Sequence, residues 1–316
     1  MKTGEELAIV DHLLACSKEA PEEISAYAIW KGRWLGRSAD WAHPLDRALA
    51  MGLAADRPAW AFAAGYQAAI QALAASASRA VDGLGAVCIT EKGGPHPARM
   101  AATLNPDPDK AGGWRLAGEK TFVSGGTAAD TLYVAAVAGK TEGGKNLLRM
   151  AVVDAQSSGV SLEELPTLNI VPEMPHARVS FDGVRLSEAD LIPGDGYLGA
   201  MKPFRTVEDL HVTAAYLAWV FGVGRRSGWP RETLSAILAL VVTARGLATA
   251  PSLTSWTHVA LGGFLHQAQQ LMAGGDDLWD RVPAETRAWW ERDRDLLRVA
   301  ARARALRFKK AWEDYA

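Results

Sequence analysis

The stretch AVCITEKGGP (86–95) decides how the chain is read, because it ends a short apolar run with a hydroxyl residue, an acid and a glycine turn. That order is typical of a strand that stops at the edge of a sheet. A second stretch, GEKTFVSG (118–125), again ends an apolar run with a hydroxyl residue and a glycine. The two stretches therefore predict a β-domain in the middle of the chain.

Short runs rich in valine, leucine, isoleucine and aromatic residues continue across this middle region, with turn residues between them. The runs are 86–90, 114–125, 131–139, 147–155 and 177–186. Their length and spacing are typical of strands joined by hairpins. We therefore expect an antiparallel β-domain over 87–195.

Both flanking regions have helical periodicity, with apolar residues at three- and four-residue steps. The predicted helices are 5–16, 21–35, 43–53 and 58–78 before the β-domain, and 206–224, 231–248, 254–273 and 284–313 after it. Residues 233–248 are apolar nearly all round, which predicts a buried helix, and the last helix places Leu296, Val299, Ala303 and Leu306 on one face. The order predicts an α+β protein of three domains: helices over 1–86, strands over 87–195 and a helical bundle over 196–316.

Composition excludes several classes of protein. The chain has 316 residues, 49% hydrophobic and 22% charged, and a formal net charge of −2, which argues against a dedicated nucleic-acid binder. Two cysteines are too few for a disulfide framework, and no metal site is predicted. No apolar run is long enough to span a membrane, and the start of the chain lacks the pattern of a signal peptide. We therefore expect a cytoplasmic protein without a membrane or nucleic-acid partner.

Three side chains near the two strand ends have the chemistry of a ring-binding site. Thr90 and Ser124, with the N–H groups beside them, offer donors to the polar edge of a flat ring, and Phe122 offers a face to cover it. The same residues also suit a site-free β-domain, because hydroxyl residues often end strands and Gly-Gly forms turns. The residues alone leave both interpretations open.

Together the two stretches resemble the middle domain of the acyl-CoA dehydrogenase family. In that family a strand ending in Thr-Glu and a glycine-rich loop precede a Gly-Glu-Lys hairpin and an aromatic-aliphatic-Thr/Ser triplet. The resemblance covers about 86–222 and includes VSFDGVRLSEADLIPGDG (179–196). It implies an N-terminal helical domain, a middle antiparallel β-barrel-like domain and a C-terminal helical bundle. It also implies an FAD-dependent oxidoreductase that acts on the CH–CH bond of an acyl thioester.

The resemblance assigns a cofactor role to five residues. Val87, Ile89 and Thr90 would line the isoalloxazine ring of FAD, with Thr90 donating to its polar edge. Phe122 would lie over the ring, where the family usually has tryptophan, and Ser124 would lie near the reactive edge. The flavin would supply the hydride chemistry, and the protein would orient it.

The family also needs a carboxylate base, and the resemblance points to Glu208. The usual Tyr-Glu-Gly-like string between the last helices is missing, whereas RTVEDLHV (205–212) stands where a minority of the family carries its glutamate. An alternative stays open, in which Glu208 and Asp209 are first-turn acids of a helix that Thr206 caps.

Departures from the family pattern support a second hypothesis. Pro95-His96-Pro97 replaces a Gly-Ser-Asp string, Met174-Pro175-His176 replaces a Ser-Asp-Thr-like string, and Arg-x-x-Phe-Gly is absent. The chain could thus be a degenerate, non-catalytic subunit that needs a partner or has lost flavin. A variant chemistry on a non-thioester substrate is a third reading. The resemblance implies an acyl-CoA or related substrate, an electron-transfer flavoprotein as acceptor, and a homodimer, homotetramer or hetero-oligomer.

Overall fold

A computed structural model describes residues 8–79 and 81–316 and divides the chain into two compact units. We call them the helical unit and the sheet unit. The helical unit comprises Met1–Ala69, Leu168–Glu173 and Thr206–Ala316, and the sheet unit comprises Ile70–Thr167 and Met174–Arg205. The predicted division into domains at 86 and 195 stays an interpretation of the sequence.

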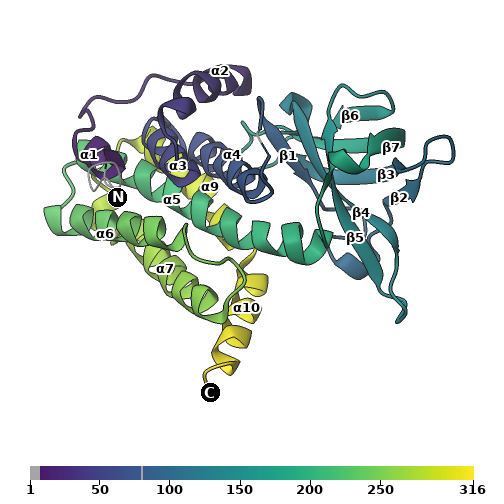
Figure 1. Cartoon of the computed structure of the whole chain (residues 1–316). Coiled ribbons are helices and arrows are strands. Elements are labelled where there is room, and N and C mark those ends of the chain that lie inside the picture. The colour runs from purple at the N-terminus through teal and green to yellow at the C-terminus, as the bar shows by residue number, and fades with distance from the viewer. Residues whose placement is uncertain (1–7, 80) are drawn as a thin grey trace. The chain divides into compact units, whose positions relative to one another are not determined.

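The sheet unit is built on one eight-stranded sheet (Figure 1). Its strands are β1 Gly85–Cys88, β2 Thr103–Pro106, β3 Gly113–Ser124, β4 Thr131–Lys140, β5 Asn146–Asp154, β6 Val160–Glu164, β7 His176–Ser187 and β8 Leu191–Ile192. The main path runs β6-β7-β3-β2-β4-β5-β8, and β1 pairs with β4 beside it. A mixed α+β architecture with a central sheet is thereby confirmed.

The prediction of the β-domain is wrong in two respects, its barrel-like closure and its purely antiparallel strands. The sheet is open, since β6 and β8 end its path and do not pair with each other within residues 8–79 and 81–316. It is also mixed, because β1 and β2 both run parallel to β4. The chain passes through β2 and β3 before it enters β4, so β1 and β4 are not joined by a hairpin. Only a crossover of this kind can bring strands together in parallel.

The core of the sheet unit forms mainly from alanine, valine and leucine side chains on most of its strands. Leu132, Val134 and Ala136 of β4 are fully buried, and Ala177, Val179 and Phe181 of β7 alternate toward the same cluster. That alternation is the period-two pattern of a strand with one face in the core. Because β4 is an inner strand, it is buried along most of its length.

The described part of the helical regions contains ten α-helices (Figure 1). They are α1 Ala8–Leu14, α2 Tyr27–Arg37, α3 Pro44–Leu53, α4 Pro58–Ser76, α5 Lys202–Arg226, α6 Arg231–Leu247, α7 Ser255–Ala273, α8 Asp276–Trp279, α9 Ala284–Asp293 and α10 Ala301–Glu313. The prolines of α3 and α4 open their helices, where a missing N–H does no harm. Of the helix predicted at 5–16, residues 5–7 lie outside the described residues. No described helix is long and apolar enough to cross a membrane.

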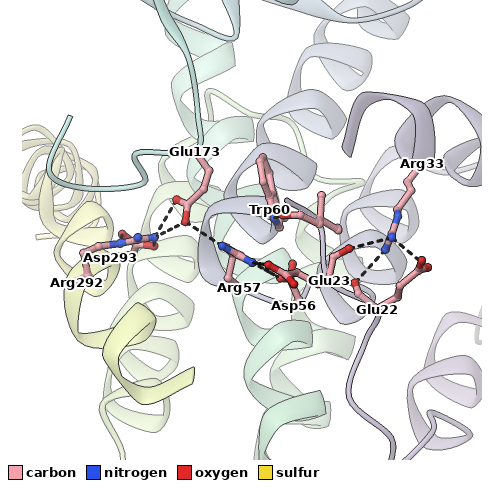
Figure 2. A network of polar contacts seen from close by, with 10 residues as sticks. Glu22, Glu23, Arg33, Asp56, Arg57, Trp60, Glu173, Arg292 and Asp293 are labelled. Carbon is pink, nitrogen blue, oxygen red and sulfur yellow. Dashed lines mark hydrogen bonds and ion pairs between the residues drawn. The ribbon is translucent and has the colours of Figure 1, made fainter. Parts of the chain in front are cut away.

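The helix predicted at 21–35 starts later, at Tyr27. The segment before it is held extended by side chains from elsewhere: Trp60 Nε1 donates to Ile24 O at 3.0 Å. Arg33 donates to the carbonyl oxygens of Glu22 and Glu23 at 3.1 and 3.2 Å (Figure 2). These tertiary hydrogen bonds compete with the first helical turn for the same backbone carbonyls.

Two further predictions, for the helix at 284–313 and for the helix at 233–248, also need correction. Residues 284–313 form α9, a 3-10 turn at Arg294–Arg298 and then α10, and Val299 and Leu306 are 74% and 61% exposed. The inward face of α10 is instead set by Arg304, which pairs with Asp209 of α5. The helix around 233–248 is buried on one face only, since Val242 is 48% exposed.

Glycine allows α3 and α4 to approach α5 closely. A Cβ atom at Gly52 would lie 2.4 Å from Ala215 O, and one at Gly65 would lie 2.5 Å from Val212 Cα. Both distances are far below van der Waals contact, so the helices meet backbone to backbone. Stacked tryptophans fill other parts of the helical unit, including Trp279 and Trp290, whose ring centroids are 5.1 Å apart.

Candidate functional site

The tertiary structure joins the two stretches that the sequence singled out. Thr90, just after β1, accepts a hydrogen bond at its backbone oxygen from the N–H of Thr121 in β3, with a donor–acceptor distance of 2.8 Å. The N–H of Thr121 is free for this bond because β3 loses its register with β7 between Lys120 and Val123. The bulge therefore connects the end of β1 to the middle of the second stretch.

A buried ion pair reinforces the same junction. Lys120 Nζ lies 2.7 Å from Glu91 Oε1, and the two side chains are 0% and 7% exposed. Glu91 also accepts hydrogen bonds from the backbone N–H groups of Ala101 and Ala102, at 2.7 and 3.1 Å. Burial alone would raise the pKa of the Glu91 carboxyl, but the bonds from Lys120, Ala101 and Ala102 lower it. The carboxylate is thus ionised and has a partner at each of its two oxygens, which makes the pair a structural joint.

Sequence reasoning assigned no role to this pair. The sequence contained a signal for the pair, because Glu91 and Lys120 lie at two otherwise apolar strand ends. Charged residues are almost never fully buried unless they are paired.

Phe122 has the most unusual backbone of the five predicted cofactor residues. Its φ angle is 52°, in the left-handed region that bulky residues avoid, and its side chain is 58% exposed. Such strain persists only when the surroundings enforce it, and it gathers at functional sites. Here the bulge and the Thr121–Thr90 bond enforce it. The result is a large aromatic side chain presented at the surface of the sheet unit.

The other four predicted residues lie on the same two segments. Val87 belongs to β1, Ile89 and Thr90 follow it, and Ser124 ends β3. Ile89 is 6% exposed, whereas Val87, Thr90 and Ser124 are half-buried. We call the set Val87, Ile89, Thr90, Phe122 and Ser124 the platform. The junction brings its two segments together, while the cofactor role of each residue stays a prediction.

His176 is a neighbour of the platform that sequence reasoning did not propose. It is the register partner of Ser124 in the β3–β7 pairing and is 8% exposed. Burial lowers the pKa of its imidazole, against a smaller opposing effect of a backbone hydrogen bond at Met174. The ring is therefore neutral at physiological pH and offers one donor and one acceptor. In the sequence it appeared only as a departure from the family string.

The altered loop after Glu91 is compact. Gly94 N donates to Glu91 O at 2.7 Å, and the side chain of His96 caps the 3-10 turn Pro97–Arg99 by accepting from Ala98 N. Asn146 Nδ2 donates to Pro97 O at 2.9 Å, which ties the loop to β5. Because Pro95 and Pro97 have no N–H, the loop offers fewer backbone donors to a phosphate than the family's string would.

Glu208 lies on α5, in the helical unit, and is half-buried. The interpretation as first-turn acids that Thr206 caps is wrong, because α5 begins at Lys202, after a π-turn at Tyr197–Met201. Asp209 has a structural use instead, since its carboxylate pairs with Arg304 at 3.0 Å and with Arg307 at 2.5 Å.

No group of three or more histidine, cysteine and acidic side chains in the described part of the chain gathers as metal ligands would.

The comparison with known protein families supports the fold found for the sheet unit. Residues 86–184 match the family model of the acyl-CoA dehydrogenase middle domain. No curated protein sequence matches the chain.

Solved structures of the same fold align with almost the whole chain. FMN-bound TdsC from Paenibacillus sp. A11-2 aligns with a TM-score of 0.70 and 14% identity over 98% of this chain and 96% of its own. The prolyl acyl carrier protein oxidase AnaB gives 0.68 and 12% over 98% and 99%. Glutaryl-CoA dehydrogenase from Mycobacterium smegmatis gives 0.60 and 15% over 98% and 94%.

The resemblance to the acyl-CoA dehydrogenase family is confirmed. Residues 86–184 match that family's middle domain, and almost the whole chain shares the fold of solved structures that include a glutaryl-CoA dehydrogenase. At these identities the structural matches establish the fold and leave the activity open.

Proposed function

We propose that the protein is an FAD-dependent oxidoreductase that removes hydrogen across the CH–CH bond next to an acyl thioester. The observation that carries this proposal is the junction of the two stretches at Phe122. It presents an exposed aromatic ring in an enforced left-handed backbone, beside the half-buried Thr90. A structural β-domain has no need for an exposed, strained phenylalanine.

The platform fits a flavin by its chemistry. Ile89 and Phe122 supply apolar surface for a planar ring, and Thr90 and Ser124 supply hydroxyl donors for its polar edge. TdsC was solved with FMN, and another solved structure of the same fold is that of an FAD-dependent dehydrogenase. A bound flavin would accept hydride, while the platform residues orient its ring and exclude water from one face.

Glu208 would act as the general base that takes the proton from the carbon next to the thioester carbonyl. Partial burial suits this role, because removing a carboxylate from water makes it a stronger base. Asp209 is engaged by Arg304 and Arg307 and so does not compete for the proton. Glutaryl-CoA dehydrogenase and the acyl carrier protein oxidase AnaB share the fold. These relatives support a thioester carried on CoA or on a carrier protein as part of the proposal, and an electron-transfer flavoprotein would reoxidise the cofactor of a dehydrogenase. A homodimer or homotetramer remains part of this proposal.

The altered loop favours a second candidate function, that of a non-catalytic subunit. Pro95 and Pro97 remove backbone donors where the family anchors phosphate, and the Arg-x-x-Phe-Gly string is absent. In that case the chain would bind flavin weakly or need a complete homologue to hold it.

The visible absorption spectrum of the purified protein tests the proposal. We expect flavin bands and stoichiometric FAD on denaturation, and we expect Phe122→Ala to weaken FAD binding by tenfold or more. Leu147→Ala is the matched control, because Leu147 is another exposed apolar residue of the sheet unit and lies outside the platform. A protein that stays colourless with excess FAD and with excess FMN would support the second candidate instead.

Anaerobic bleaching by acyl thioesters then tests Glu208. Glu208→Gln should retain the flavin and lose bleaching by acyl-CoA and acyl carrier protein substrates alike. Glu232→Gln, an exposed first-turn glutamate of α6, is the control. Full bleaching of the Glu208→Gln protein would exclude Glu208 as the base.

A further inference from the structure

A cavity of about 540 Å³ lies wholly within the helical unit. It is lined by the segment before α2, the residues just before α4, the end of α5, and the start of α9 with the loop before it. Neither Glu208 nor any platform residue lines it. Its size is that of a pocket for a small organic molecule.

One wall of the cavity carries a buried acid that is only half used. Asp56 is 9% exposed, and its Oδ2 accepts from Arg57 Nε and Nη2 at 3.0 and 2.8 Å. Its Oδ1 is buried and has no hydrogen-bond partner among the described residues. Buried polar atoms are nearly always satisfied, so this oxygen points to a missing partner.

Arg57 is too heavily engaged to bind a ligand itself (Figure 2). It pairs with Asp56, with Glu23 at 3.3 Å and with Glu173 at 3.6 Å, and Glu173 is held in turn by Arg292 at 2.9 Å. Its guanidinium also lies 4.4 Å from the ring centroid of Trp289, which lines the cavity. Arg57 therefore fixes both Asp56 and the aromatic wall in place before any ligand arrives.

The remaining charges of the cavity are mostly positive. Lys18, Arg226 and Arg281 line it, and none of them forms an ion pair with an acid of the described chain. Burial lowers the pKa of the Arg226 guanidinium, against a smaller opposing effect of Cys16. Glu285 lies on the same lining and is exposed. The cavity thus offers cations without an acidic partner among the described residues, of which Arg281 donates to Gly228 O at 3.5 Å, an aromatic wall and a carboxylate oxygen without a hydrogen bond.

We propose that this cavity binds an aromatic amino acid or a compound of the same chemistry. The carboxylate would pair with Arg226 and Arg281, the ring would pack on Trp289, and the ammonium group would donate to Asp56 Oδ1. Each partner satisfies a group that the protein leaves open, and Arg–carboxylate contacts are among the stronger polar contacts available. The site is independent of the platform and of the proposed oxidoreductase activity.

Calorimetric titration of the full chain with three matched probes tests this site. L-phenylalanine carries all three groups, 2-phenylethylamine lacks the carboxylate, and 3-phenylpropionate lacks the amine. We expect saturable binding of L-phenylalanine, and binding at least tenfold weaker for each of the other two. No saturable binding of L-phenylalanine at millimolar concentration would overturn the proposal and leave water as the partner of Asp56.

Variants locate the binding. Arg226→Gln and Trp289→Leu should each weaken L-phenylalanine at least tenfold. Arg298→Gln and Trp312→Leu are the controls, since both residues are exposed and line no part of the cavity. If Arg226→Gln fails to fold, Arg281→Gln, at an exposed position, replaces it in the binding measurement. Unchanged affinity in the folded cavity variants would also overturn the proposal.

Discussion

The two units bury charge in different ways. In the sheet unit, Lys120 and Glu91 form one closed pair, in which Glu91 accepts three hydrogen bonds and both of its carboxylate oxygens have a partner. In the helical unit, Arg57 links Glu23, Asp56 and Glu173 into an open network that leaves Asp56 Oδ1 without a partner. A closed pair holds backbone segments together, whereas an open network leaves groups available for a ligand. The comparison distinguishes charged groups that hold backbone segments together from charged groups that are open to a ligand.

The closed pair should show the largest effect when it is broken. Lys120→Met leaves the Glu91 carboxylate buried without a cation, which should reduce the free energy of unfolding by about 3–5 kcal/mol. Urea unfolding measures this loss. The double variant Glu91→Gln/Lys120→Met removes both charges and should regain part of the stability. If Lys120→Met costs less than about 1 kcal/mol, the value of an exposed pair, then the pair is not a closed joint.

Acid should loosen the helical unit before the sheet unit. Burial lowers the pKa of His211, and also that of His43, to about 4. Nδ1 of His211 donates to Val207 O at 2.7 Å, and its buried Nε2 has no partner among the described residues, so the neutral ring is the folded form. Between the unfolded value near 6.5 and about 4, the unfolded chain binds more protons, so stability falls as pH falls, by up to about 3 kcal/mol for His211.

Hydrogen exchange against pH, read separately on peptides of each unit, measures this acid effect. His211→Gln should flatten the pH dependence of the helical unit, while His266→Asn, at an exposed position of α7, should leave it unchanged. The lowered pKa of Glu91 acts at lower pH, because its contribution is intact above the unfolded value of 4.5 and is lost as pH falls from there through the lowered value. Equal loosening of both units at pH 5 would contradict the comparison.

Glycine substitutions should show which helices of the helical unit pack backbone to backbone and which do not. Gly65→Ala places a Cβ atom 2.5 Å from Val212 Cα and should destabilise the protein by about 1–3 kcal/mol, because rigid backbone must move apart. Gly32→Ala in α2 is the control, since a Cβ there meets nothing within 4 Å. It should stabilise the protein by about 0.5–1 kcal/mol through helix propensity. Thermal unfolding of both variants decides the matter, and equal effects would refute the close approach.

An exposed ion pair of the sheet unit should matter least. Arg178 lies 2.7 Å from Glu163 on neighbouring strands, with side chains 39% and 66% exposed. Arg178→Gln should change the free energy of unfolding by less than about 1 kcal/mol, and added salt should remove most of the difference. Chemical unfolding at two salt concentrations measures it. A loss as large as that of Lys120→Met would erase the distinction between buried and exposed charge.

Much of the fold could be predicted from local patterns. The alternation in β7 predicts its strand directly, because one face of the strand is buried, and the recurrence of apolar residues at three- and four-residue steps predicts α3 and α4. The extended segment before Tyr27 could not be predicted, since Trp60 and Arg33 hold it and neither is a sequence neighbour. The break between α9 and α10 escaped for a similar reason, because Arg304 and Arg307 are drawn to Asp209 on α5.

For the candidate site, the sequence alone determined which residues have ring-binding chemistry and which family they resemble. Side-chain type and order along the chain carry that information, as Thr90, Phe122 and Ser124 show. Only the tertiary structure decided that the Thr90 and Phe122 segments meet, that Glu91 and Lys120 hold them, and that Asp209 pairs with Arg304 and Arg307. Only the tertiary structure also showed that the sheet is open, because strand pairing depends on how the whole chain crosses over between strands. Contacts between residues far apart in the chain are set by packing in three dimensions, and no local pattern of residues records them.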